Sequence, residues 1–376
     1  MGIHLNKVTI LDIEIQVFFI VFVLFGISTS NNLPANFVFG DSLVDVGNNN
    51  YILSLTKANF LPFGIDFGRP TGRFTNGRTI VDIIGKILKR TGQELGFGLT
   101  PPYLAPTTVE SVILKGVNYA SGGGGILNLT GHVLGGRLNF DAQIDYFANT
   151  RQDIISCIGV LEALNLLKNA LFSVTIGSND FINNYLAPNV AYFMYKSYSP
   201  EIFVTTLISK LQTQLTRLFN LGARKIVVVN VGPIGCIPNQ RDANLAEGDS
   251  CVTFPNQLAN LFNTQLKTLV SELNSNLAGS RFVYADIYHI LEDILINYAA
   301  FGFENPSSAC CNMAGKFGGL IPCGPTSKVC WDRSKYVFWD PYHPSDAANV
   351  AIAKRLLDGG SADISPMNIR QLFQSS

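Results

Sequence analysis

Short runs of apolar, often β-branched residues recur along the chain and alternate with longer segments of helical spacing. Each run has the length of a buried strand, and the five runs lie at 36–39, 117–119, 171–176, 225–231 and 281–287. The helical pattern is clearest at 201–221, where an apolar stripe ends before Gly222; its members are Ile202, Thr205, Ile208, Leu211, Leu215 and Leu218. Alternation of this kind requires crossover connections between parallel strands. It predicts a three-layer α/β/α sandwich around a mostly parallel five-stranded sheet.

The chain has the size and composition of one large globular domain. Of its 376 residues, 47% are hydrophobic and 14% are charged, so it has ample material for a core and no sign of disorder. Lysine plus arginine and aspartate plus glutamate number 27 each, which leaves no basic field to attract a nucleic acid. We therefore expect no nucleic-acid partner.

The N-terminus predicts secretion. Lys7 precedes an apolar run at 15–27, which is shorter than the roughly 20 residues that span a bilayer. Small residues at 28–30 offer a cleavage site before Asn31. Residues 1–30 are accordingly interpreted as a signal peptide and 31–376 as one extracellular domain without a membrane span. A retained signal anchor is the alternative.

All seven cysteines follow the predicted signal peptide, and secretion favours disulfides among them. Cys236 and Cys251 flank a loop rich in turn residues and are expected to pair. A second group lies in a Gly/Pro-rich stretch and can pair in three ways: Cys310, Cys311, Cys323 and Cys330. Cys157 is left as a free, buried thiol. No histidine accompanies the group and its spacing lacks two CxxC knuckles, so we expect no metal site.

One N-glycosylation sequon is present, Asn128-Leu129-Thr130. It predicts an exposed loop that carries a glycan on Asn128.

A serine follows the first predicted strand directly, in the sequence Gly40-Asp41-Ser42-Leu43. The glycine lets the chain turn at the carboxyl edge of the sheet, where ligands bind in folds of this class. A Gly-Asp-Ser turn is also ordinary loop chemistry, so Ser42 needs a partner elsewhere in the chain.

A histidine near the C-terminus meets that need. In Asp340-Pro341-Tyr342-His343 a carboxylate precedes an imidazole by three residues, within a turn bounded by prolines. Asp340 can then accept the Nδ1 proton of His343 and leave Nε2 to take a proton from a serine hydroxyl. His132 and His289 have no such partner and are interpreted as structural.

Two further segments can supply oxyanion donors at the same sheet edge. Glycines at 122–125 follow the second predicted strand, and Asn179 follows the third. The glycine run lacks the Lys-Ser/Thr of a phosphate-binding loop and the GxGxxG pattern of a dinucleotide site. Backbone amides of the run and the side-chain amide of Asn179 therefore fit an esterase better than a nucleotide site.

Taken in order, these segments resemble the blocks of the GDSL esterase/lipase family of the SGNH hydrolases, in its plant secreted branch. The four blocks are Gly40-Asp41-Ser42-Leu43, Ser121-Gly122-Gly123, Gly177-Ser178-Asn179-Asp180 and Asp340-Pro341-Tyr342-His343. The resemblance implies a flavodoxin-like open sheet and a secreted enzyme that hydrolyses acyl esters of lipids or small molecules without a metal or cofactor.

The resemblance also implies the roles of single residues. Ser42 is the expected nucleophile, His343 the general base and Asp340 its orienting group. The expected oxyanion donors are the amides of Ser42 and Gly122 and the side chain of Asn179, with Gly123 open as an alternative because four consecutive glycines blur the register.

Two other functions fit the same residues. An acyltransferase uses the same triad but delivers the acyl group to an alcohol instead of water. A secreted binding protein can keep the fold without turnover. A glycoside hydrolase is disfavoured, because no second acid has a context like that of Asp340.

Overall fold

The computed structural model describes residues 35–88, 99–187, 198–248 and 250–375. Residues 1–30, interpreted above as a signal peptide, lie outside them. The remaining chain from Pro34 to Ser376 forms one compact unit.

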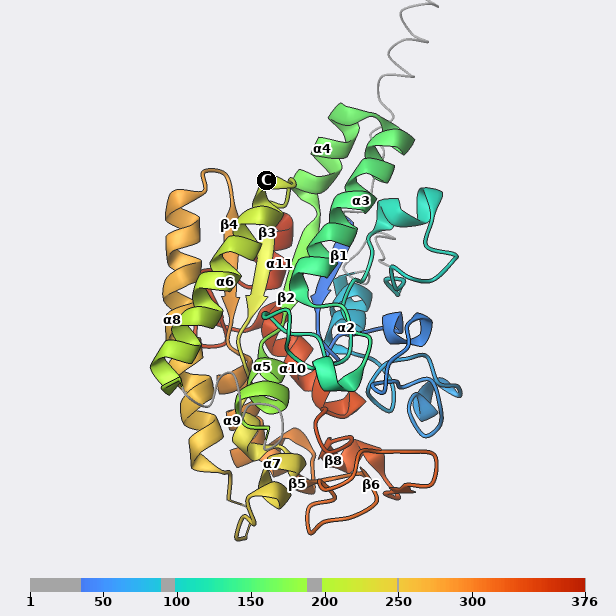
Figure 1. The fold of residues 1–376 in the computed structure, drawn as a ribbon, viewed down its shortest axis with the longest axis vertical. Coiled ribbons are helices and arrows are strands. Elements are labelled where there is room, and N and C mark those ends of the chain that lie inside the picture. Colours follow the sequence, from blue (N-terminus) through green and yellow to red (C-terminus); the bar gives the residue numbers. More distant parts are fainter. Residues whose placement is uncertain (1–34, 89–98, 188–197, 249, 376) are drawn as a thin grey trace, which may run out of the picture. The chain divides into compact units, whose positions relative to one another are not determined.

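A five-stranded sheet runs through this unit in the order β1-β2-β3-β4-β9, as Figure 1 shows. The first four strands are parallel and in register, and β9 pairs antiparallel with β4. Their bounds are Asn36–Gly40, Leu171–Thr175, Lys225–Val229, Arg281–Ala285 and Ile364–Ser365. The predicted fold class is confirmed.

One of the five predicted strands is wrong. Residues 117–119 lie beside β1 but form no strand; Asn118 makes an isolated parallel bridge to Pro102 on one side and another to Val38 on the other. Three hydrogen bonds join this segment to β1, from Val38 N to the Val117 oxygen, from Tyr119 N to the Val38 oxygen and from Ser121 N to the Gly40 oxygen. The Gly40 amide donates to the Gln143 side chain instead of the Tyr119 oxygen, which interrupts the ladder. The fifth strand is instead the two-residue β9.

Side chains alternate between the two faces of the sheet and build a core on each face. Phe37, Phe172 and Val228 face one layer of helices, whereas Leu171, Val227 and Val283 face the other. The first layer holds α3 (Phe140–Ile158), α4 (Val160–Asn169), α6 (Pro200–Asn220) and α8 (Thr253–Asn276). The second holds α2 (Ile80–Leu88), α9 (Ile287–Ile296), α10 (Asp346–Asp358) and α11 (Ile369–Gln374).

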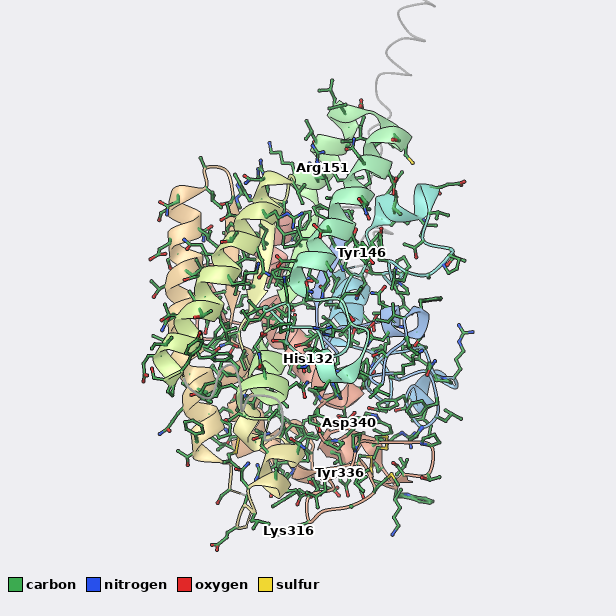
Figure 2. The ribbon with its side chains drawn as sticks, viewed as in Figure 1. His132, Tyr146, Arg151, Lys316, Tyr336 and Asp340 are labelled. Atoms are coloured by element: carbon green, nitrogen blue, oxygen red, sulfur yellow. A yellow bond between two sulfur atoms is a disulfide. The ribbon has the colours of Figure 1, made fainter. Side chains whose placement is uncertain are left out.

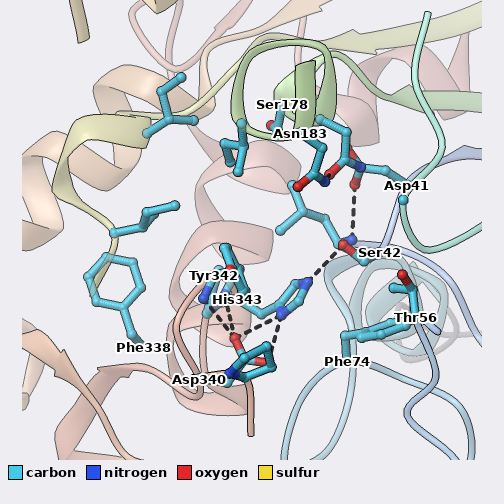
Figure 3. A pocket seen from close by; sticks show the side chains of 18 of the residues that line it. Asp41, Ser42, Thr56, Phe74, Ser178, Asn183, Phe338, Asp340, Tyr342 and His343 are labelled. Carbon is cyan, nitrogen blue, oxygen red and sulfur yellow. Dashed lines mark hydrogen bonds and ion pairs between the residues drawn. The ribbon is translucent and has the colours of Figure 1, made fainter. Parts of the chain in front are cut away.

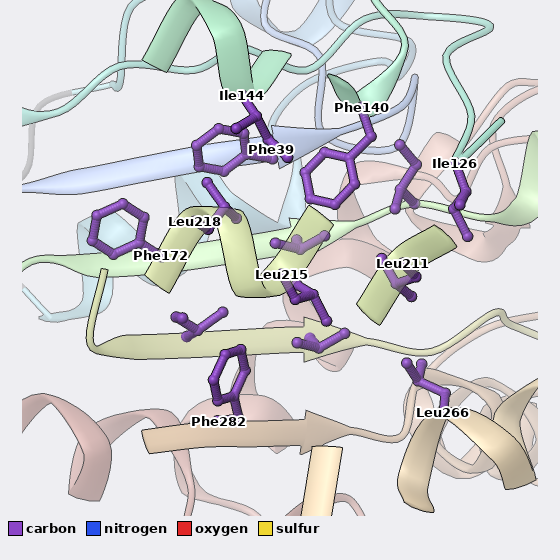
Figure 4. Packing of buried hydrophobic residues seen from close by; sticks show 14 of the residues in the cluster. Phe39, Ile126, Phe140, Ile144, Phe172, Leu211, Leu215, Leu218, Leu266 and Phe282 are labelled. Carbon is purple, nitrogen blue, oxygen red and sulfur yellow. The ribbon is translucent and has the colours of Figure 1, made fainter. Parts of the chain in front are cut away.

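Helix α6 shows how the first layer packs. Leu211, Leu215 and Leu218 lie over the aromatic side chains of the strands (Figure 4). The predicted stripe also included Ile202 and Thr205, which are exposed; Phe203 and Val204 occupy the buried face instead. The helix begins at Pro200, and its first two turns bury Phe203, Val204 and Leu207.

Beyond the carboxyl ends of the parallel strands lies a segment with little regular structure. It contains α7 (Pro238–Ala243) and short strand pairs between β5 (Asn305–Ala309) and β8 (Tyr336–Phe338) and between β6 (Cys311–Asn312) and β7 (Lys328–Val329). Asp340 follows β8 and lies beyond the arrowheads of β1 and β3 (Figures 1 and 2).

Candidate active site

Ser42 sits on the turn that directly follows β1. The amide of Asp41 donates to the Thr175 carbonyl of β2, and the Asp41 side chain accepts the Leu43 amide at 3.0 Å. Gly40 is required here, because a Cβ at this position would lie 2.4 Å from the Thr175 oxygen. Gln143 of α3 bonds both the amide and the carbonyl of Gly40 at 2.8 Å. The serine hydroxyl is thereby presented at the carboxyl edge of the sheet.

The Asp340–His343 turn is fixed by hydrogen bonds within itself. Oδ1 of Asp340 accepts the backbone amides of Tyr342 and His343, each at 2.8 Å. The His343 carbonyl in turn accepts the Trp339 amide at 2.8 Å. Phe74 packs against the imidazole with a ring-centre distance of 5.3 Å. The imidazole therefore has one orientation.

The two segments meet as a chain of three side chains (Figure 3). Nδ1 of His343 lies 2.8 Å from each carboxylate oxygen of Asp340, and Nε2 lies 2.7 Å from Ser42 Oγ. Asp340 and His343 are buried, at 2% and 8% exposure, whereas Ser42 is half-buried. With the proton on Nδ1 held by the carboxylate, Nε2 is the acceptor for the serine hydroxyl.

The glycine loop presents Gly123, not Gly122, to this site. The Gly122 amide donates to Asp45 Oδ2 at 3.0 Å, so it is already used. Gly123 lines the cavity at Ser42, with a φ of +81° that favours glycine. Its amide and that of Ser42 donate no hydrogen bond to any residue that the structure describes. Of the two registers that the sequence left open, the contacts favour Gly123.

Asn179 reaches the same place from α5 (Ser178–Asp180). Its Oδ1 accepts from Asn183 at 2.6 Å, and its Nδ2 donates to the Gly124 carbonyl at 2.9 Å. These two contacts fix which end of the amide is the donor. The second N–H of Nδ2 stays available, and Asn179 lines the cavity.

Two buried carboxylates hold the glycine loop from both ends. Asp45 accepts the amides of Gly47 and Asn48 as well as that of Gly122. Asp180 accepts the amides of Ile126 and Leu127 at 2.8 and 3.0 Å and the hydroxyl of Thr130 at 2.6 Å. The sequence analysis missed both residues. Asp45 had a signal, because the Asp-Val-Gly-Asn run that starts there is typical of a side chain that accepts amides of its own turn.

Burial dominates the electrostatics of these acids. It raises the pKa of Asp41 to about 7 and the pKa values of Asp45 and Asp180 to about 6, while the hydrogen bonds that each accepts act in the opposite direction. Three buried acids thus surround the serine turn and the glycine loop, and amide or hydroxyl donors stabilise each of them.

A cavity of about 360 Å³ opens at the triad. Aliphatic and aromatic side chains line most of it, and Ser42, Asn179, Asp340 and His343 are among its polar lining residues. Two loop segments, 48–78 and 183–198, contribute to the lining, through Leu55 and Phe60 from the first and Asn183 from the second. The part of the second loop at 188–197 lies outside the described residues.

Comparison with known families agrees with this arrangement. The profile of the GDSL-like lipase/acylhydrolase family matches residues 37–356, which span both the Ser42 turn and the Asp340–His343 turn. The chain belongs to this family.

Curated GDSL relatives align over nearly their whole length. The Arabidopsis thaliana protein named GDSL esterase/lipase At4g16230 is 63% identical over 340 residues, which cover 90% of this chain and 91% of the relative. GDSL esterase/lipase At3g50400 of the same plant is 51% identical, with 90% and 91% covered, and At2g23540 is 49% identical, with 90% and 88% covered. The similarity to the family therefore extends over about nine tenths of the chain.

Three disulfides stabilise this GDSL-family fold, and two of them lie next to the Asp340–His343 turn. Cys236 is bonded to Cys251, and the second group pairs as Cys310–Cys330 and Cys311–Cys323. The amides of Cys310 and Cys311 donate to the carbonyls of Phe338 and Trp339, directly before Asp340. The disulfide cluster thus supports the loop that carries the histidine.

The remaining predicted residues lie apart from the triad. Cys157 is free, as expected, but it is exposed on α3 and not buried, because its helix position faces away from the sheet. His132 is exposed, and His289 lies 3.8 Å from Asp363. Asn128 is exposed in the loop after the glycine run.

Within the described ranges, no helix is both long and apolar enough to cross a membrane. The same residues contain no group of three or more His, Cys, Asp or Glu side chains placed to hold a metal ion.

Proposed function

We propose that this GDSL-family chain hydrolyses carboxylic esters with Ser42 as nucleophile, His343 as general base and Asp340 as the group that orients the imidazole. Its family is that of lipases and acylhydrolases, and its relatives are named esterase/lipase. The observation that carries the residue roles is the 2.7 Å contact between His343 Nε2 and Ser42 Oγ, in line with the bond from Nδ1 to Asp340.

In the proposed reaction Ser42 Oγ attacks the ester carbonyl while its proton passes to His343 Nε2. The tetrahedral intermediate collapses to an acyl-enzyme, and the imidazolium returns the proton to the departing alcohol. A water molecule then repeats the attack, with His343 again as base, and releases the free acid. Asp340 keeps the negative charge that stabilises the imidazolium in both halves.

We further propose that the oxyanion is bound by the amides of Ser42 and Gly123 and by Nδ2 of Asn179. All three residues line the cavity, and each has an N–H left without a partner among the described residues. Donors that are fixed before the reaction stabilise developing charge most effectively.

The products distinguish hydrolysis from acyl transfer. Purified protein is incubated with a p-nitrophenyl ester in the absence and presence of an alcohol, and the free acid and the new ester are quantified. We expect free acid to remain the main product. A new ester in excess of the acid would assign the same triad to an acyltransferase, and no reaction by well-folded protein would favour a binding function.

Replacement of Asp45 by asparagine tests the role of the glycine loop. The carboxylate accepts three amides, whereas an asparagine must turn its NH₂ toward at least one of them. The freed Gly122 amide lets the loop shift, and kcat is expected to fall by about 10²–10³-fold, as for the loss of one oxyanion donor. Ester kinetics should show the loss in kcat with little change in KM.

Asp363→Asn is the matched control for lost stability. It also neutralises a buried carboxylate, one that pairs with Arg355 and does not line the cavity. If both variants melt at a lower temperature but only Asp45→Asn has a lower kcat, the fall in kcat results from the displaced glycine loop and not from lower stability. Equal kcat values in Asp45→Asn and the parent protein would contradict the assignment.

We also propose that residues 1–30 are a signal peptide, that 31–376 is the secreted hydrolase domain and that Asn128 carries a glycan. Three disulfides and the exposure of Asn128 support this. Protein recovered from the medium of secretory cells should begin near Asn31 and shift in gel mobility on deglycosylation.

The Asn128→Gln variant should show no such shift. This substitution is preferred to one at Thr130, because the Thr130 hydroxyl donates to Asp180 and its loss would also disturb the glycine loop. Retention of residues 1–30 in the recovered protein would instead indicate an anchor.

A further inference from the structure

Phe74 packs against the imidazole of His343 and is itself held from several sides. Its side chain is buried, and Figure 3 shows it beside the histidine. The residues before and after it are anchored. Arg73 forms a bidentate ion pair with the buried Asp82 of α2, at 2.7 and 2.8 Å, and the carbonyl of Thr75 accepts a backbone amide at 2.9 Å. The position of the ring is therefore set by the fold before any substrate binds.

Gly122 leaves the space that the ring of Phe74 occupies. A Cβ on Gly122 would lie 2.7 Å from Cζ and 2.9 Å from Cε2 of Phe74, and 2.9 Å from Cγ2 of Thr56. The φ of Gly122 lies outside the left-handed region, so its backbone does not require glycine. The close approach of the aromatic ring does. The glycine loop and the histidine turn thus meet at the two sides of one phenyl ring.

The imidazole lies partly over the face of this ring. The ring centres of Phe74 and His343 are 5.3 Å apart, and the ring planes are inclined by 34°. Two rings so close and so nearly parallel would overlap if they lay edge to edge, so the arrangement that remains is offset stacking. The face of a phenyl ring carries partial negative charge and attracts a cation within about 6 Å of the ring centre. Phe74 is therefore placed to attract His343 whenever the imidazole is protonated.

The ring nitrogens of His343 are already used by other groups. Nδ1 faces the carboxylate of Asp340 and Nε2 faces Ser42, while Asp41 on the serine turn interacts with the imidazole electrostatically. His343 is buried, so little water reaches the faces of its ring. A buried cation is costly unless its surroundings compensate for the lost water. At one face of the imidazole, Phe74 provides that compensation.

We propose that Phe74 is a positioning residue of the ester hydrolysis, and that its ring face stabilises the protonated His343 that forms in both halves of the reaction. The inference rests on the proposed function. No bond to Phe74 forms or breaks; the proton that leaves Ser42, and later the water, stays on Nε2 beside the ring until it passes on. Because a neutral imidazole gains less from the ring than an imidazolium does, the ring favours the transition state over the resting enzyme.

Fluorine tests the proposal because it withdraws charge from the ring face with little change in shape. It is placed at the Cδ positions of Phe74, since Cζ and Cε2 lie against Gly122. Replacement of Phe74 by 2-fluoro- and then 2,6-difluorophenylalanine should lower kcat stepwise, and Phe74→Leu, which lacks a ring, should lower it by about 2–30-fold. KM should change little. The ester is one whose hydrolysis shows a solvent deuterium isotope effect, so that proton transfer limits kcat.

The same fluorinated residues in place of Phe63 are the matched control. Phe63 is buried, lines the same cavity and packs against Phe74 with ring centres 6.0 Å apart. Its ring contacts are with Phe60, Phe74 and Trp339 and not with His343. Fluorine at this position should leave kcat unchanged. An equal fall in kcat at both positions, or a kcat that does not depend on fluorine at Phe74, would overturn the proposal.

A titration without turnover separates this inference from the proposed function. Ring-nitrogen NMR follows the protonation of His343 in the Ser42→Ala protein. Because the ring favours the protonated form, fluorine at Phe74 should lower the pH at which half of His343 is protonated, and Phe74→Leu should lower it by about 0.4–1.5 pH units. Asp340 and Asp41 are the same in every variant, so the difference reports the ring alone. This result in a protein without esterase activity would support the stabilisation by Phe74 and reject the hydrolase. An unchanged titration in a protein with esterase activity would reject the role of Phe74 alone.

Discussion

Replacement of Ser42 by alanine is expected to lower kcat/KM for p-nitrophenyl butyrate by about 10⁴–10⁶-fold and to leave folding intact. The side chain is half-buried and its hydroxyl is held only by His343 Nε2, so the change removes one oxygen atom and no packing contact of consequence. Thermal unfolding should therefore occur at an unchanged temperature. The residual rate reports what the oxyanion donors and substrate binding supply without a nucleophile.

A serine-directed fluorophosphonate probe gives a second readout of the same variant. The parent protein should be labelled at Ser42 and the Ser42→Ala variant should not be labelled. Ser178 provides the comparison, since it also lines the cavity but is not the serine in contact with His343. Label on Ser178, or equal ester hydrolysis by parent and Ser42→Ala protein, would contradict the proposed nucleophile.

Asp340→Asn is expected to lower kcat by about 10⁴-fold through the tautomer of His343. Oδ1 of Asp340 accepts two backbone amides, from Tyr342 and His343. An asparagine would keep its oxygen toward these donors and turn its NH₂ toward Nδ1 of the imidazole. Nδ1 must then accept, the proton moves to Nε2, and Nε2 can no longer take a proton from Ser42.

Two measurements distinguish a change of the His343 tautomer from unfolding of the protein. Asp340→Asn should melt close to the parent temperature, and ring-nitrogen NMR of His343 should show the proton on Nε2 instead of Nδ1. Asp340→Ala removes the acceptor of both backbone amides as well and should lower the melting temperature. An Asp340→Asn variant that retains a tenth or more of the parent kcat would reject the role of the carboxylate.

The layers of the fold could be predicted because they depend on long patterns. Strands β1 to β4 are continuous apolar runs, and buried parallel strands produce such runs in any sequence context. Strand β9 has two residues and therefore no periodicity to detect. Residues 117–119 have the composition of a strand, but the Gly40 amide, which a longer ladder would use, donates to the side chain of Gln143, 103 positions away in the sequence.

The contact among Ser42, His343 and Asp340 could be predicted because each side chain lies in a short motif with its own chemistry. Which glycine faces the cavity could not be predicted, because four glycines differ in no side-chain property. Their register is set by Asp45, 77 positions before Gly122, through one hydrogen bond that exists only in the folded chain. The exposure of Cys157 likewise depends on which face α3 presents to the sheet.

Ser42, the proposed nucleophile, and His343, the proposed base, are 301 positions apart in the sequence, although their side chains are in contact in the folded chain. When synthesis has reached Ala285, at the end of the fourth parallel strand, the nascent chain contains all four parallel strands and Ser42. It does not yet contain His343, which would accept the proton of Ser42. If His343 is the base, as proposed, nascent chains and truncated products that end before His343 cannot hydrolyse esters, however well they fold. Esters in the compartment where the protein is made meet an active enzyme only when synthesis is nearly over and the two ends have met.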